Sequence, residues 1–198
     1  MPQKQFVLLK KVFSMFSIIF TIFTLVHEFG HAEYIRKTTL KYRLKYEPSI
    51  ILIGSEYAPM TKPKCTIKFK NYIIKFYKGD QGKGLTLSLH FSSFNMNDIS
   101  NIAKAGYCYV KRLIQVLFII SILSAVPLFP LPISILVLIL VNIVFVFVLQ
   151  IFHDDFLKSS DYLYFSDPKK FDCRQAHFLY QAYAENQYDE CHSDDPAT

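Results

Sequence analysis

A stretch of 40 residues without Asp, Glu, Lys or Arg, at positions 113–152, limits the folds open to this chain more than any other feature. A membrane helix needs roughly 20 apolar residues to cross ~30 Å of hydrocarbon, so this stretch is long enough for two. Three prolines between positions 127 and 132 interrupt it. The sequence therefore predicts two membrane helices, Leu113 to Leu128 and Leu131 to Phe152, with the prolines at the turn.

A third apolar run, Val12 to Val26, precedes this pair. Its 15 residues are too few to cross a bilayer alone, but with the continuation to Ile35 they reach a spanning length. A short apolar run after lysines is also typical of a signal peptide, but cleavage would destroy the motif described below. We expect an α-helical membrane protein with three transmembrane helices, the first within residues 1–35.

The basic residues are distributed asymmetrically. Residues 36–112 contain 15 Lys and Arg, against 3 before them, none in the apolar stretch and 4 after it, while residues 154–198 carry a net charge of −6. The positive-inside rule then places residues 36–112 in the cytoplasm and the N-terminus outside, as in a multi-pass protein of a bacterial plasma membrane. Basic residues that alternate with apolar ones favour strands near anionic lipid, and we expect no nucleic-acid partner.

Alternating residues predict strands between the first two helices. Residues 39–54 alternate basic and apolar side chains, and residues 65–91 have the pattern of a hairpin with Gly79, Gly82 and Gly84 in its turn. A short helix at 95–112 would return the chain to the membrane. The predicted segments are therefore 1–35, an antiparallel β region of three or four strands at 36–111, a helical hairpin at 112–152, and 153–198 with the acidic tail.

His27, Glu28 and His31 form the pattern HExxH at the end of the first apolar run. In a helix, positions i and i+4 lie one turn apart on one face, so both imidazoles can bind one Zn²⁺ while the glutamate acts as general base beside it. A random chain of this composition contains the pattern about one time in two hundred. The alternative is that the helix ends at Val26 and leaves the motif as interfacial polar residues.

Zinc needs a third protein ligand, with the fourth position left for water. If three helices cross the bilayer, the segment after Phe152 emerges on the same side as His31 in either orientation. A dication would also offset the cost of ionisable groups at membrane depth. The candidate ligands in that segment are His153, Asp154, Asp155, Asp161 and Asp167.

The motif "VHEFGHAEYI", the strand region, the "AG" at Ala105 and Gly106, and an aspartate after the third helix resemble the site-2 protease family of intramembrane zinc metalloproteases. In that family the third ligand is the aspartate of an Asp-Gly motif, preceded by serine in short bacterial members. "SSDYLYF" matches the serine and the aspartate, so the resemblance implies Asp161 as third ligand over Asp154 or Asp155. Tyr162 stands where the family has glycine.

The resemblance implies a zinc metalloendopeptidase that cuts a membrane-associated peptide or single-span protein near the cytoplasmic face of the bilayer, with Glu28 as catalytic residue. Because a helical substrate must unwind before cleavage, we expect it to bind as an added strand on Ser49 to Gly54 or on Leu85 to Phe91. The alternative is an inactive protease-like protein with a binding, immunity or transporter-accessory role. The residues leave the substrate and the oligomeric state open.

Overall fold

The computed structural model describes residues 3–45, 47–57, 61–80, 82–125 and 131–185. Within them the chain is mostly helical, with one small sheet. The elements are α1 (Gln3–Lys41), β1 (Ser49–Ile53), β2 (Cys65–Lys68), β3 (Tyr72–Phe76), β4 (Gly84–Leu87), α2 (Met96–Ala125), α3 (Leu131–Lys158), α4 (Ser160–Ser166) and α5 (Cys173–Glu185), with 3₁₀ turns at Phe91–Ser93 and Pro168–Lys170. The expected proline turn at 127–130 and the last residues, 186–198, lie outside the described residues.

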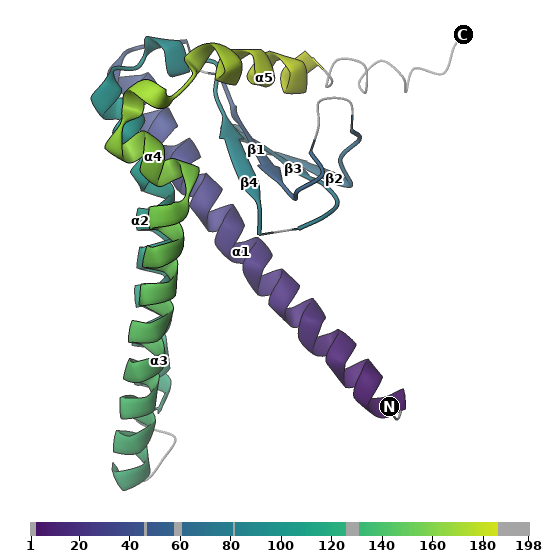
Figure 1. The fold of residues 1–198 in the computed structure, drawn as a ribbon, viewed down its shortest axis with the longest axis vertical. Coiled ribbons are helices and arrows are strands. Elements are labelled where there is room, and N and C mark those ends of the chain that lie inside the picture. The colour runs from purple at the N-terminus through teal and green to yellow at the C-terminus, as the bar shows by residue number, and fades with distance from the viewer. Residues whose placement is uncertain (1–2, 46, 58–60, 81, 126–130, 186–198) are drawn as a thin grey trace.

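The long helices diverge from a common upper body (Figure 1). Helices α2 and α3 run side by side as a hairpin, and α1 descends at an angle to them. The sheet lies beside the upper half of α1, α4 lies against the top of α2, and α5 crosses above the sheet. The sheet and the short helices α4 and α5 therefore all pack at the upper end of the long helices.

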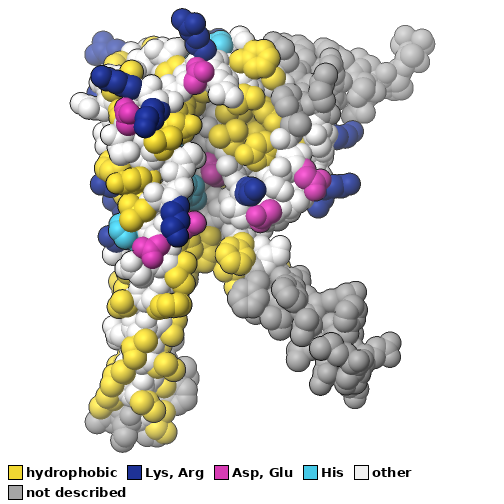
Figure 2. Space-filling model, in the orientation of Figure 1, with side chains coloured by type: hydrophobic (Ala, Val, Ile, Leu, Met, Phe, Trp, Pro, Cys, Tyr) yellow, Lys and Arg dark blue, Asp and Glu magenta, His cyan; other side chains and the backbone are white. Residues whose placement is uncertain are grey.

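Two helices in the described part of the chain are long and apolar enough to cross a membrane: Met96–Ser124 within α2, and Ile133–Lys158 within α3. Hydrophobic side chains cover the lower length of this hairpin, whereas charged side chains gather on the upper body (Figure 2). The predicted apolar hairpin is present, with α3 continuing past Phe152. A membrane crossing by α1 stays a prediction.

The sheet is mixed, and the prediction of an antiparallel region was wrong in this respect. Its strand order is β2-β3-β1-β4, with β1 parallel to β3 and antiparallel to β4. Among the strands of the described residues, only β2 and β3 form a hairpin, so the predicted hairpin of β3 with β4 does not occur. All five residues of β1 are buried, and a strand covered on both faces is most stable in the centre of a sheet.

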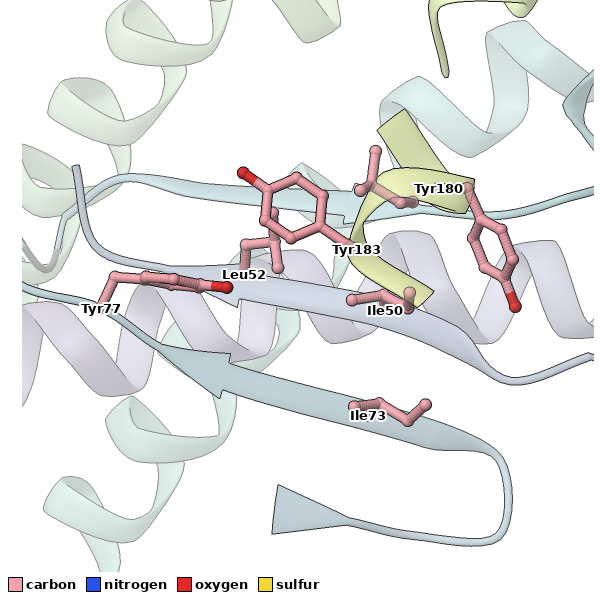
Figure 3. Close-up of a cluster of buried hydrophobic side chains, with 7 residues drawn as sticks. Ile50, Leu52, Ile73, Tyr77, Tyr180 and Tyr183 are labelled. Carbon is pink, nitrogen blue, oxygen red and sulfur yellow. The ribbon is translucent and has the colours of Figure 1, made fainter. Parts of the chain in front are cut away.

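Both faces of β1 are covered by helices. Ile50 and Leu52 point toward Tyr180 and Tyr183 of α5 (Figure 3). Ile51 and Ile53 belong to a second cluster that includes Ala32 of α1. The four β1 side chains are 0% exposed, and burying each contributes about 1.5–3 kcal/mol. This packing fixes the sheet against the helix that carries the HExxH motif.

The first helix extends beyond its predicted end at Ile35. It continues to Lys41 and closes with Arg43 in the left-handed region at φ 54°, where the strand expected from residue 39 would have begun. Tyr42 and Leu44 do share a side, as the alternation predicted, but they pack on the cluster around Phe94 from a loop. Similarly, α2 is one continuous helix where we expected a short helix followed by a membrane span.

Candidate metal centre

The side chains of His27, His31 and Asp161 converge at the junction of α1 and α4. The distance from Asp161 Oδ2 is 2.7 Å to Nε2 of His27 and 3.2 Å to Nε2 of His31, and the two Nε2 atoms lie 3.1 Å apart. The two histidines are four residues apart in one helix, so they share a face. These are the three residues predicted as ligands, and the structure places them together.

The three atoms fit a tetrahedral zinc site. Ligands at about 2.0–2.1 Å from zinc are about 3.3 Å apart at tetrahedral angles, which a shift of a few tenths of an ångström would produce here. His31 Nδ1 donates a hydrogen bond to the carbonyl oxygen of Ile102, 2.6 Å away. This bond places one ring proton on Nδ1, so Nε2 is the atom that His31 could offer to a metal in exchange for its own proton, as in histidines that bind metals.

Asp161 owes its position to the first turn of α4. Ser159 caps this helix by accepting a hydrogen bond from the backbone N–H of Tyr162. Burial raises the pKa of Asp161, but hydrogen bonds from the imidazoles of His27 and His31 outweigh it and hold that pKa below its ordinary range. The carboxylate is therefore ionised at neutral pH and suited to bind a cation.

The residue after Asp161 need not be glycine in this fold. Tyr162 lies inside the right-handed helix α4, and its ring packs on Phe156, with centroids 5.7 Å apart. Glycine is required only where φ is positive or space is absent. The departure from the family's Asp-Gly pattern is thus compatible with the position of the carboxylate.

The other predicted candidates for the third ligand lie outside the cluster. Asp154 accepts a hydrogen bond from Gln150 on an exposed face of α3, and His153 contacts Tyr107 there. Asp155 lines the cavity described below, and Asp167 pairs with Lys170. Among the described His, Cys, Asp and Glu side chains, the ligand-atom grouping contains His27, His31 and Asp161 alone.

Two glycines allow α2 to approach the motif closely. A Cβ at Gly106 would lie 2.5 Å from Nε2 of His31 and 2.8 Å from Nε2 of His27. A Cβ at Gly30 would lie 2.8 Å from the carbonyl oxygen of Ala105. The "AG" of Ala105 and Gly106 therefore serves the close helix packing that its resemblance to the family implied.

Glu28 is held by the strand β4. The hydroxyl of Thr86 donates to its carboxylate, with Oγ1 2.8 Å from Oε2, and also lies 3.0 Å from the backbone carbonyl oxygen of Glu28. Gly84 is pressed against the same side chain, since a Cβ there would lie 2.7 Å from Oε1. Glu28 is only 6% exposed, so these contacts restrict its carboxylate.

The sequence analysis missed Thr86 and assigned Gly84 to a turn. The alternation in this strand places Leu85, Leu87 and Leu89 on one face and Thr86 and Ser88 on the other. The polar face is buried too, with Thr86 at 8% and Ser88 at 3% exposure. A pair of small hydroxyl side chains alternating with leucines was the available signal for a strand with two buried faces.

A cavity of about 870 Å³ contains the cluster. Most of its wall is apolar, and nine aromatic residues contribute to it: Phe20, Phe23, Tyr57, Phe91, Tyr107, Phe152, Phe156, Tyr164 and Phe171. Glu28, Gly84 and Thr86 line it as well. The arrangement thus places the His27, His31 and Asp161 side chains and the Glu28 carboxylate on the wall of one cavity.

The strand order distinguishes between the two predicted substrate templates. β1, within Ser49 to Gly54, is central, so its hydrogen bonds are already made to β3 and β4 and it cannot accept another strand. β4 is at an edge of the sheet and begins at Gly84, beside Glu28. Of the two templates, only the one that begins at Leu85 lies at a sheet edge, and its strand ends at Leu87 instead of continuing to Phe91 as predicted.

Fold and site together define a helical protein with an apolar hairpin and a two-histidine, one-carboxylate cluster beside a glutamate. No protein-family model, no curated protein and no solved structure matches this chain.

Proposed function

We propose that this chain is a membrane-bound zinc endopeptidase similar to the site-2 proteases, with His27, His31 and Asp161 as the metal ligands. The observation that carries the proposal is the convergence of two Nε2 atoms and one carboxylate oxygen within 3.2 Å of one another. Two neutral imidazoles and one carboxylate suit zinc, and three protein ligands are typical of catalytic sites. In this proposal α1 is a third membrane helix, and the site faces the cytoplasm.

The chain's own residues supply the proton transfers. When bound, zinc would acidify a water molecule and polarise the scissile carbonyl. Glu28, next in sequence to His27, accepts the proton of that water and delivers it to the leaving amine. The hydrogen bond from Thr86 limits the carboxylate to one orientation for both transfers.

The edge strand β4 gives the substrate a place to bind in extended form. A peptide that pairs with this edge makes main-chain hydrogen bonds, which do not depend on its sequence. Its backbone would then run past Glu28, because Gly84 and Thr86 both contact that side chain. An unwound segment of a membrane-associated polypeptide fits this geometry.

The test is the variant Glu28→Gln in purified protein reconstituted with zinc. We expect zinc content equal to wild type and no cleavage of a membrane peptide mixture, because the amide cannot accept the proton. Glu47→Gln is the matched control, since Glu47 pairs with the exposed Lys45 and should leave both readings unchanged.

Two results would contradict the proposal. Cleavage that continues undiminished in Glu28→Gln removes Glu28 from catalysis. A wild-type protein that holds one zinc ion but cleaves nothing supports the alternative, an inactive relative with a binding role.

A further inference from the structure

The exposed side chains of the α2–α3 hairpin change from apolar to charged at a definite position on each helix. On α2 the last charged residues are the exposed Lys111 and Arg112, and the run of exposed apolar side chains that follows them begins at Val116. On α3 the continuous run of exposed apolar side chains ends at Ile151, and charged residues follow from Asp154, with the exposed Leu157 among them. Each helix therefore changes from apolar to charged within about one turn.

Ring contacts show that these changes occur at one level. Tyr107 stacks on Phe156 with centroids 4.5 Å apart, and Phe118 stacks on Phe145 at 4.1 Å. In antiparallel helices these two pairs place Arg112 opposite Ile151. Phe23 of α1 contacts the next residue, Phe152, at 5.2 Å, so all three helices meet the same boundary.

The candidate metal centre lies on the charged side of this boundary. Gly106, which touches both imidazoles, is six residues from Arg112, or about 9 Å along the helix axis. His27 is four residues beyond Phe23, or about 6 Å. A long arginine can reach upward from inside the hydrocarbon, but the short exposed carboxylates of Asp154 and Asp155 cannot.

The apolar length below the boundary already matches a bilayer. From Ile133 to Ile151 the exposed apolar part of α3 is about 27 Å long, close to the ~30 Å of hydrocarbon in a membrane. The headgroup layer adds roughly 5–8 Å on each face. A centre about 6–9 Å above the boundary therefore lies at the level of the headgroups.

We propose that the metal centre lies outside the hydrocarbon core, and that its substrate is the juxtamembrane segment of a membrane-anchored polypeptide. The part about the substrate rests on the proposed peptidase function, whereas the position of the site does not. A segment that leaves the bilayer can be extended without exposing its amides to hydrocarbon, where an unsatisfied amide costs several kcal/mol. Such a segment meets the edge of β4 without prior unwinding inside the membrane.

The position is testable without activity because the chain contains no tryptophan. Single-tryptophan variants Tyr107→Trp and Leu117→Trp report two levels of the same helix, about 15 Å apart. The variants are reconstituted in liposomes whose acyl chains carry bromine, a quencher confined to the hydrocarbon. We expect several-fold stronger quenching of Leu117→Trp, and stronger quenching of Tyr107→Trp by aqueous acrylamide.

Equal bromine quenching of the two variants would overturn the proposed position. If Tyr107→Trp does not fold, Phe171→Trp replaces it, because Phe171 lines the same cavity. In that variant too, strong bromine quenching contradicts the proposal.

The substrate class is tested with two synthetic single-span polypeptides. One carries an unstructured flank beyond its apolar segment, and the other ends at the apolar segment. We expect wild-type protein to cut only the first, with every cut in the flank. Cuts within the apolar segment overturn the proposed substrate, and absence of cleavage together with the expected tryptophan result removes the peptidase function but leaves the position intact.

Discussion

Gly106 lies directly against the imidazole of His31: a Cβ at position 106 would come within 2.5 Å of Nε2. The same Cβ would lie 2.8 Å from Nε2 of His27. Helix α2 therefore forms one wall of the candidate metal centre through a residue that has no side chain.

Gly106→Ala should reduce zinc affinity more strongly than it reduces the stability of the fold. The added methyl group overlaps the two ligand imidazoles, which must move away from their present positions. Changes of this kind beside metal ligands reduce affinity by roughly 10- to 100-fold. Zinc affinity measured by competition with a chromogenic chelator tests this, with Gly82→Ala as control because a Cβ there meets only Asp80, at 3.2 Å.

Gly30→Ala should act mainly on helix packing. Its Cβ would lie 2.8 Å from the backbone oxygen of Ala105 and 3.0 Å from Cα of Gly106, and backbone atoms cannot move aside as side chains do. We expect a loss of about 1–3 kcal/mol in the free energy of unfolding, typical of overpacking. Thermal unfolding in detergent with zinc absent would measure it, and an unchanged midpoint would contradict the close packing of α1 on α2.

Asp161→Ala should remove most of the bound zinc, because it deletes one of the three proposed ligands. Asp154→Ala should leave zinc content unchanged, since that carboxylate accepts its hydrogen bond from Gln150 on an exposed face. Metal analysis of both purified variants gives the comparison. The reverse order would exclude Asp161 as third ligand and point to a different arrangement of α4.

Thr86→Val should lower kcat while zinc content stays at the wild-type level. Valine matches threonine in shape but cannot donate to the carboxylate of Glu28. Loss of a buried hydrogen bond to a charged group costs about 1.5–3 kcal/mol, or roughly 10- to 100-fold in rate. Thr86→Ser retains the hydroxyl and should restore most of kcat, and equal loss in both variants would indicate a packing role only.

Local features of this protein could be read from the sequence. The apolar hairpin follows from a long stretch without charge, and the shared face of His27 and His31 follows from the helical period. The end of α1 could not be read in the same way. Residues 39–45 alternate as a strand would, yet α1 continues to Lys41. Its last turns pack against α2 and against Tyr42 and Leu44, which follow the helix.

Contacts between segments that are distant in the chain could not be predicted from the sequence and required the tertiary structure. β1 lies between β3 and β4, although the sequence favoured pairing of the two strands on either side of a glycine-rich turn. The reason is burial: β1 has apolar side chains on both faces, and only a central position covers them. Thr86 reaches Glu28 as a result of this order.

The sequence by itself determined that the two imidazoles share a helix face, that a glutamate adjoins them, and that the apolar helices exist. Spacing within one helix and total apolar length are properties of a continuous segment. The residues alone left five candidates for the third ligand and the family resemblance implied Asp161, but only the tertiary structure brought that carboxylate to the two imidazoles. That carboxylate meets His27 across 134 residues of chain, and its position depends on how α4 packs on α2. No local pattern records such a distance, since it arises when separate elements bury their apolar faces against one another.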